Sequence, residues 1–201
     1  FVGRHLLAKL NKSECVLFGR KSPDNEYNFN SFDLTNHNQA DLTQLLLPIT
    51  VIIHCAARVH VMNDLLIDPL KAYREANTEG TLNLARQSAE AGVKRFVFLS
   101  SIKVNGEATY DHLAFRSSDD PSPQDPYSVS KAEAEKQLLD LGAQTGMEIV
   151  IIRSPLVYGQ GVKANFSSLM TFVGKGFPLP FRSINTNKRS LVSVYNLVDL
   201  I

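Results

Sequence analysis

The stretch that decides the fold is Arg95-Phe96-Val97-Phe98-Leu99-Ser100-Ser101, a short apolar run that ends in two hydroxyl side chains. A run of this length and composition is typical of a strand that is buried inside a parallel sheet. Open parallel sheets place their ligand sites beyond the carboxyl ends of their strands. We therefore expect Ser101 at the rim of such a site, where a hydroxyl can both donate and accept a hydrogen bond.

Apolar runs and helical patterns alternate on both sides of this stretch. The alternation is typical of a doubly wound α/β fold with a parallel sheet. We expect strands at residues 14–18, 50–55, 95–101 and 148–153, and a short additional strand at 27–29. We expect helices at residues 3–10, 40–47, 68–91, 126–141 and 165–173. Residues 105–125 are rich in Ser, Asp and Pro and predict a long loop, which in a compact domain is often functional.

The composition excludes several classes of protein. The chain has 201 residues, of which 44% are hydrophobic and 20% charged, so one substantial core can form. A net charge of +1 without blocks of like charge argues against nucleic-acid binding. No apolar run is long enough to span a membrane, and we expect a cytoplasmic protein. Cys15 and Cys55 lie in apolar runs and the five histidines lack ligand spacing, so we expect no metal site.

Helix-start signals precede a second informative stretch, Pro126-Tyr127-Ser128-Val129-Ser130-Lys131. Asp125 is a favourable N-cap, and proline is favourable in the first helical turn. Residues four apart on a helix share a face. We therefore expect the phenol of Tyr127 and the ammonium of Lys131 to project to the same side.

This pair has a chemical use. A free phenol has a pKa of about 10, and lowering it to about 7 takes roughly 4 kcal/mol. A lysine ammonium about 5 Å away supplies roughly 3 kcal/mol at an effective dielectric constant of about 20. With Ser101, the pair predicts an acid/base set for hydride transfer at a hydroxyl or ketone. By itself the Tyr-Lys spacing also fits an exposed helix face, and the strand that ends at Ser101 favours the catalytic interpretation.

Taken together, these residues resemble those of a known family. The chain resembles the extended short-chain dehydrogenase/reductases, specifically the NAD-dependent epimerase/dehydratase group that acts on nucleotide sugars. The matching stretches are Phe1-Val2-Gly3, His54-Cys55-Ala56-Ala57, Asn77 with Gly80-Thr81, Ser100-Ser101, Pro126-Tyr127 through Lys131, Arg153 with Val157-Tyr158-Gly159, and Lys188-Arg189-Ser190.

The resemblance implies a bound dinucleotide. The residues that it assigns to the cofactor are Gly3, Asp33, Leu34, Ala56, Ala57, Asn77, Tyr127, Lys131 and Pro155. NAD-preferring members usually end the second strand with an acidic residue, where this chain has Arg20. Arginine would suit a 2′-phosphate, so the cofactor is NAD or NADP.

It also implies a UDP-sugar substrate. Ser101 would hold the reacting sugar hydroxyl, Asn165 would meet the nucleotide diphosphate, and Arg189 would grip it with its fork of donors. Either His60 or Met62 is expected to lie near the sugar.

Two hydride chemistries remain open, and so does a third role. A 4-epimerase would pass through a 4-keto sugar and regenerate its cofactor, whereas a 4-ketoreductase would consume NADPH on a UDP-4-keto-6-deoxyhexosamine. A non-catalytic dinucleotide-binding scaffold is the alternative from another class. Dehydratase activity is not expected, since Ser101-Ile102-Lys103 stands where dehydratases resemble one another in Thr-Asp-Glu.

Both ends of the chain look abrupt. Phe1-Val2-Gly3 resembles the end of a glycine-rich turn without its preceding strand, and residues 196–201 resemble the opening of a helix. We expect residues 1–160 to be a Rossmann domain that lacks its first strand, and residues 161–201 to begin a substrate-binding region that is mostly missing. We expect this piece alone to hold no cofactor and to be inactive, and the parent protein to be a homodimeric enzyme.

Overall fold

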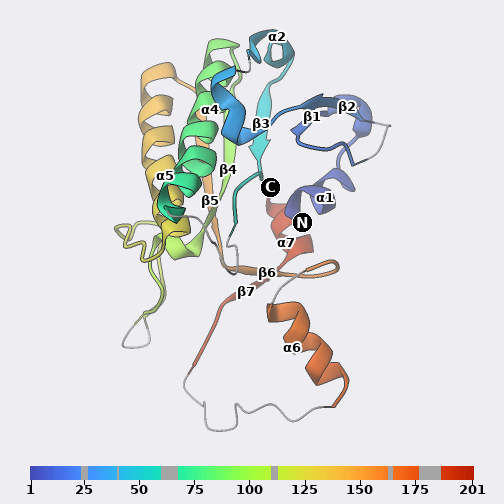
Figure 1. Cartoon of the computed structure of the whole chain (residues 1–201), viewed down its shortest axis with the longest axis vertical. Coiled ribbons are helices and arrows are strands. Elements are labelled where there is room, and N and C mark those ends of the chain that lie inside the picture. The colour runs from blue at the N-terminus through green and yellow to red at the C-terminus, as the bar shows by residue number, and fades with distance from the viewer. Residues whose placement is uncertain (24–26, 40, 60–67, 110–112, 163–164, 177–186) are drawn as a thin grey trace. The chain divides into compact units, whose positions relative to one another are not determined.

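The structure is a computed structural model that describes the chain except residues 24–26, 40, 60–67, 110–112, 163–164 and 177–186 (Figure 1). It forms two compact units, Leu10–Arg153 and the combination of Phe1–Lys9 with Ser154–Ile201. In the described part of the chain, no helix is both long enough and apolar enough to cross a membrane.

Parallel strands form the framework of the unit Leu10–Arg153. Strand β1 (Val16–Gly19) pairs in parallel with β2 (Asn28–Ser31), and Gly19 lies opposite Ser31. A second sheet has the order β3 (Val51–His54), β4 (Arg95–Ser101) and β5 (Glu148–Ser154). Strand β3 runs parallel to β4, with Val51 opposite Arg95. These strands confirm the five expected from the sequence.

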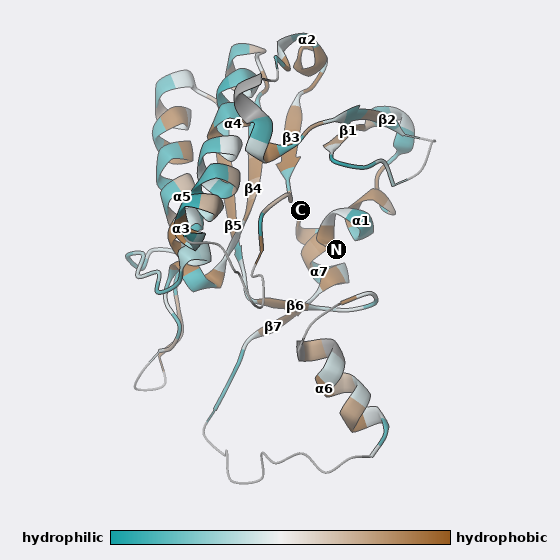
Figure 2. Cartoon of the chain, viewed as in Figure 1, coloured by the Kyte–Doolittle hydropathy of each residue, from teal (hydrophilic) through white to brown (hydrophobic). Residues whose placement is uncertain are grey.

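Strand β4 is the central strand of the second sheet because its side chains are apolar on both faces. Phe96 and Phe98 are fully buried, and Val97, on the opposite face, is 6% exposed. Figure 2 shows β3, β4 and β5 as predominantly hydrophobic, whereas the helices beside them alternate between hydrophobic and hydrophilic residues. This pattern is the one expected of a parallel sheet covered by amphipathic helices.

Helices cover this sheet. They are α2 (Thr43–Leu46), α3 (Pro69–Tyr73), α4 (Gly80–Glu90) and α5 (Pro126–Thr145). Helices α4 and α5 pack side by side along the sheet (Figure 1). The helix expected at residues 68–91 is present without a break in the chain of helical turns. Its middle, Arg74–Glu79, is a π turn that lies between α3 and α4. A π turn inserts an extra residue into the ladder of hydrogen bonds, and the sequence carries no simple signal for it.

Local signals set the ends of α5. One carboxylate oxygen of Asp125 accepts a hydrogen bond from the N–H of Ser128 at 2.7 Å, and the Ser128 hydroxyl accepts one from the N–H of Asp125 at 3.1 Å. This reciprocal capping box starts the helix at Pro126, as the sequence predicts. Gly146 ends the helix with a φ of 77°, a conformation that glycine adopts at little cost.

The second unit is smaller. It contains α1 (Val2–Leu7), β6 (Leu156–Tyr158), α6 (Asn165–Gly174), β7 (Leu191–Ser193) and α7 (Val194–Leu200). Strands β6 and β7 pair in parallel, and neither was expected from the sequence. The His5 side chain joins parts of the unit through a 2.8 Å hydrogen bond to the Gln160 carbonyl oxygen and an edge contact with the Tyr195 ring. The expected domain boundary at residue 160 stays a prediction.

Candidate active site

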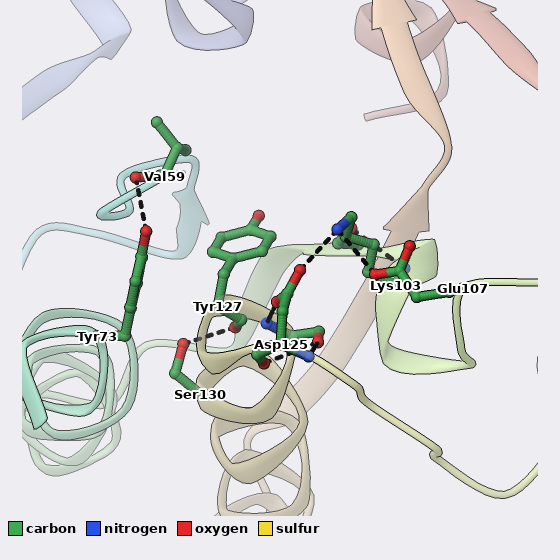
Figure 3. A network of polar contacts seen from close by, with 9 residues as sticks. Val59, Tyr73, Lys103, Glu107, Asp125, Tyr127 and Ser130 are labelled. Atoms are coloured by element: carbon green, nitrogen blue, oxygen red, sulfur yellow. Dashed lines mark hydrogen bonds and ion pairs between the residues drawn. The ribbon is translucent and has the colours of Figure 1, made fainter. Parts of the chain in front are cut away.

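The three predicted catalytic residues come from β4 and α5, within one compact unit. Ser101 is the last residue of β4, and Tyr127 and Lys131 lie one turn apart at the start of α5. Tyr127 is half-buried, and its ring packs edge-on against Tyr73 with 6.1 Å between centroids. Figure 3 shows Tyr127 between Tyr73 on one side and Asp125 with Lys103 on the other. The phenol is therefore surrounded by polar groups at the amino end of α5.

The predicted acidification of Tyr127 is wrong for this structure. Burial is the main cause that raises the pKa of Tyr127 to about 12; the Asp125 carboxylate and Tyr73 act in the same direction, and the Lys103 ammonium opposes them. Desolvation disfavours a phenolate, and this effect exceeds the attraction of the Lys103 ammonium. The spacing of residues along the helix carries no information about this loss of water around the ring.

Lys131 is bound by strand β4 through its ammonium. Its side chain is 1% exposed, and its ammonium donates a 2.9 Å hydrogen bond to the Leu99 carbonyl oxygen. The ammonium also lies 4.2 Å from the centre of the Phe98 ring, a distance suited to a cation–π contact. Burial lowers the pKa of Lys131 to about 7, against the attraction of Cys55 and Glu135. Strand β4 therefore holds a lysine whose pKa is well below the ordinary value.

Ser101 performs a structural task that leaves its proton available. Its Oγ accepts a 3.3 Å hydrogen bond from the N–H of Lys103 and caps the 3₁₀ turn Ile102–Val104. A hydroxyl that accepts one bond can still donate another. The neighbouring Ser100 hydroxyl, by contrast, donates to the buried Glu135 carboxylate. Ser101 thus has donor capacity at the end of β4.

Asn77 lies in the π turn and connects two elements of the site. Its amide nitrogen donates to the Arg58 carbonyl oxygen at 3.0 Å and to the Ser130 hydroxyl at 3.1 Å, and its oxygen accepts from the Arg58 N–H at 2.8 Å. The Ser130 hydroxyl in turn donates to the Tyr127 carbonyl oxygen at 2.7 Å. Asn77, which is fully buried, therefore clamps the segment after β3 to the first turn of α5.

Several predicted cofactor residues also follow strand ends in this unit. Ala56 is exposed and Ala57 half-buried, directly beyond β3. Arg20 is exposed beyond β1, and Asp33 lies two residues beyond β2. Hydrogen bonds from the Thr35 N–H and hydroxyl and the nearby Arg20 charge lower the pKa of the Asp33 carboxyl, against the effect of partial burial. The structure thus brings Arg20 and Asp33 close enough for their charges to interact.

Leu34 is buried by a close backbone contact. It is 9% exposed, and a Cβ added at Gly80 would collide with the Leu34 carbonyl oxygen. The absence of a side chain at Gly80 therefore allows the segment after β2 to approach α4.

The remaining predicted residues lie outside this unit or outside the described part of the chain. Gly3 in α1, Pro155, Asn165 at the start of α6, and the exposed Arg189 belong to the other compact unit. His60 lies outside the described residues, as does Met62.

A buried ion pair behind the site was not expected from the sequence. Arg153 on β5 donates to both oxygens of Glu135 on α5, with the shortest distance 2.7 Å, and also to Asn105 at 3.1 Å. Glu135 follows Lys131 by one turn and is 3% exposed. The one available signal was Arg153 itself, since a charged residue within a strand of apolar residues predicts a buried partner.

His54 is a core residue. It is 4% exposed, its Nε2 lies 3.0 Å from the Thr81 hydroxyl, and its ring stacks on Phe98. Burial, together with the Lys131 charge, lowers the pKa of His54 to about 3. Among the described residues, no group of three or more His, Cys, Asp or Glu side chains is placed to hold a metal ion.

Known proteins resemble this chain in sequence and in fold. The model of the NAD dependent epimerase/dehydratase family matches residues 1–201. Over 152 residues the chain is 61% identical to a UDP-glucose 4-epimerase of Vibrio cholerae, a match that covers 76% of this chain and 46% of that protein. Over 140 residues it is 29% identical to an N-acetyl-alpha-D-glucosaminyl-diphospho-ditrans,octacis-undecaprenol 4-epimerase of Escherichia coli O157:H7, covering 67% of this chain and 40% of that protein. The chain spans less than half the length of these two relatives.

Solved structures resemble it over almost its whole length. MoeE5 in complex with UDP-glucuronic acid and NAD has a TM-score of 0.77 at 28% identity, covering 99% of this chain and 67% of that one. The UDP-glucose 4-epimerase of Thermotoga maritima, solved with UDP-glucose, has a TM-score of 0.80 at 20% identity, covering 99% and 68%.

These parallel strands and their covering helices form a Rossmann-like α/β fold, which confirms the predicted fold class. The chain belongs to the NAD-dependent epimerase/dehydratase family, which confirms the resemblance found in its sequence.

Proposed function

We propose that the whole protein is a nucleotide-sugar 4-epimerase that acts on a UDP-hexose or a UDP-N-acetylhexosamine. One observation carries this proposal: Ser101, Tyr127 and Lys131 lie around the end of β4, in a chain 61% identical over 152 residues to a UDP-glucose 4-epimerase. MoeE5, which is 28% identical, was solved with NAD and a UDP-sugar, and this supports the same two classes of ligand.

The residues present fit a dinucleotide. Small side chains at Ala56 and Ala57 leave the backbone beyond β3 approachable, and Ala56 is exposed. Asp33 and Leu34 would face the adenosine part, and Asn77 would shape the segment beside it. Gly3 and Pro155 are proposed for the same cofactor. NAD is the proposed cofactor, and the exposed Arg20 keeps NADP as the alternative.

The reaction begins with a proton. Tyr127 would take the proton of the sugar 4-hydroxyl, while the Ser101 hydroxyl donates to the same oxygen and orients it. When bound, the oxidised nicotinamide supplies a positive charge and a reversible hydride acceptor. Because burial raises the pKa of Tyr127 to about 12, the phenolate would need this added positive charge besides that of the Lys103 ammonium. Tyr127 would return its proton to the 4-oxygen after the 4-keto sugar has rotated in the site to present its other face.

A 4-ketoreductase is the second candidate, and one observation favours it. Arg20 is exposed directly beyond β1, where its charge would suit the 2′-phosphate of NADPH, the cofactor that this reaction consumes. In that reaction Tyr127 would give its proton to the 4-oxygen of a UDP-4-keto-6-deoxyhexosamine. Arg20 would then bind the 2′-phosphate of NADPH.

An assay of the whole protein separates the two. UDP-glucose and UDP-N-acetylglucosamine are supplied in one set, and a UDP-4-keto-6-deoxy sugar with NADPH in the other. Interconversion of 4-epimers without net cofactor consumption supports the epimerase, whereas stoichiometric NADPH loss with the keto sugar alone supports the reductase. Tyr127→Phe should abolish either activity, and full activity in that variant would contradict both proposals.

The finer expectations are also proposals. Asn165, Arg189 and His60 are proposed for the substrate, and a homodimer in the cytoplasm is proposed for the whole protein. Chemical cross-linking and sedimentation of the whole protein test its oligomeric state, and alanine variants of Asn165 and Arg189 test substrate affinity through KM.

A further inference from the structure

An ion-pair cluster connects the segments that carry Ser101 and Tyr127. The Lys103 ammonium donates to Asp125 Oδ2 at 2.6 Å and to Glu107 Oε1 at 2.9 Å (Figure 3). Lys103 lies two residues after Ser101, and Asp125 lies two residues before Tyr127. The cluster therefore bridges β4 and α5 across a connection of more than twenty residues.

Asp125 uses its two carboxylate oxygens for different tasks. Oδ1 accepts from the Ser128 N–H and caps α5, while Oδ2 binds Lys103. On the other side, the Lys103 N–H donates to the Ser101 hydroxyl. An uninterrupted series of polar contacts thus runs from the Ser101 hydroxyl through Lys103 to the first turn of α5.

The two carboxylates that bind Lys103 differ in what they can stabilise. The Asp125 side chain is 26% exposed and belongs to the helix cap, whereas the Glu107 side chain is 49% exposed and lies four residues along the same segment as Lys103. Pairs between exposed side chains contribute little. Only the bond to Asp125 ties separate elements together, so Glu107 offers a matched control.

The charges of this cluster also act on Tyr127. After burial, the charged and titratable groups that affect its pKa are Asp125 and Tyr73, which raise it, and Lys103, which lowers it. Lys131, on the next turn of α5, directs its ammonium to Leu99 instead. Lys103 is therefore the cation, in the described part of the chain, that favours the Tyr127 phenolate.

We propose that Lys103 is a positioning residue, which binds Asp125 and thereby holds Tyr127 at a fixed place relative to Ser101. This proposal rests on the proposed function in one respect, that Ser101 and Tyr127 act on the same sugar oxygen. The bridge between β4 and α5 does not depend on it.

The bridge is tested by hydrogen exchange of the whole protein, measured at the main-chain amides of Ser128 and Val129. The variants are Lys103→Met, Asp125→Asn and Glu107→Gln. Asparagine caps helices as well as aspartate does, so Asp125→Asn removes the ion pair and keeps the cap. We expect exchange about fivefold faster in Lys103→Met and Asp125→Asn and unchanged in Glu107→Gln. Equal exchange in all three variants and the parent would overturn the proposal, whether or not the protein acts on sugars.

The effect on chemistry is tested by the pH dependence of kcat. Lys103→Met should shift the limb that belongs to Tyr127 to higher pH, and Asp125→Asn should shift it to lower pH, each by roughly half a unit to one unit. Lys103→Arg should restore the parent profile, and Glu107→Gln should keep it. A loss of kcat of about tenfold in Lys103→Met without any shift would show that Lys103 acts on structure alone. That result would contradict the effect of the Lys103 charge on the pKa of Tyr127. Absence of all sugar activity in the parent would instead count against the proposed function.

Discussion

The ammonium of Lys131 is bound to the Leu99 carbonyl oxygen at 2.9 Å, so the lysine of the proposed catalytic pair is held by the sheet beneath its helix. Since Leu99 lies two residues before Ser101 on β4, this bond ties the start of α5 to the strand that carries the third site residue. This hydrogen bond replaces part of the hydration that the ammonium loses on burial. The pKa of Lys131 therefore differs between the folded and the unfolded state.

The stability of the protein should therefore depend on pH through Lys131. Its pKa is lowered from 10.5 to about 7, so between these values the folded state binds fewer protons than the unfolded state. Stability consequently rises with pH in this window, by up to about 1.4 kcal/mol per unit. Lys131→Met should remove this slope, which urea denaturation at pH 7, 8 and 9 measures.

Lys136 provides the control for this prediction, because it lies on the same helix and is exposed. Lys136→Met should retain the slope of the parent protein. Parallel pH dependences in the parent and in Lys131→Met would contradict the lowered pKa of Lys131.

Loss of one partner of the buried pair of Arg153 and Glu135 should destabilise the protein strongly. Replacement of both partners by apolar side chains should destabilise it less. The two side chains are 18% and 4% exposed and lie 2.7 Å apart. Removal of one partner leaves an uncompensated charge in the interior, so Arg153→Met should lower the free energy of unfolding by about 3–5 kcal/mol. The double variant Arg153→Met with Glu135→Leu should lose less than Arg153→Met alone, as measured by urea denaturation.

Arg95 and Glu148 form the matched surface pair. They also lie 2.7 Å apart, but their side chains are 50% and 58% exposed. Arg95→Met should change the free energy of unfolding by about 1 kcal/mol or less. Equal losses for Arg95→Met and Arg153→Met would show that burial does not set the strength of the Arg153 pair.

Gly80 should not tolerate a methyl group, although it lies at the start of a helix where alanine is normally favourable. A Cβ at this position would collide with the Leu34 carbonyl oxygen and lie 3.0 Å from the Leu34 carbonyl carbon. Because these are backbone atoms, Gly80→Ala should lower stability by about 1–3 kcal/mol in thermal denaturation. Gly174→Ala at the end of α6 has open space and should be neutral or stabilising.

Asn77 should matter for stability before any cofactor is added. Asn77→Asp keeps an oxygen for the Arg58 N–H but loses the donors to the Arg58 carbonyl oxygen and the Ser130 hydroxyl, so we expect a loss of about 2–3 kcal/mol in urea. In Asn83→Asp, the control on α4, the oxygen that accepts from Gln87 at 2.6 Å remains. An unchanged stability of Asn77→Asp, with weaker binding of NAD by the whole protein, would make Asn77 a cofactor contact and not a clamp.

Local signals in the sequence were sufficient for the main elements. The bounds of β4 are those expected from the run of residues 95–101, since a short apolar run with strand-forming side chains is stable only inside a sheet. The start of α5 follows from Asp125 and Pro126, whose effects act within one helical turn. The spacing of Tyr127 and Lys131 is likewise a property of the helix alone.

Elements that depend on distant partners escaped prediction. Strands β6 and β7 are three residues each, too short for a periodic pattern, and exist because they pair with one another. The π turn at Arg74–Glu79 appears where Asn77 reaches Arg58 and Ser130 in two other segments.

The amino-acid sequence by itself predicted that Ser101 lies at the end of β4 and that Tyr127 precedes Lys131 by one turn of α5. Only the tertiary structure decided the pKa values of Tyr127 and Lys131. The Tyr127 ring is half-buried beside Tyr73, and the Lys131 ammonium binds the carbonyl oxygen of a strand residue more than thirty residues earlier. Desolvation and long-range hydrogen bonds depend on everything that surrounds a group, and no local spacing contains that information.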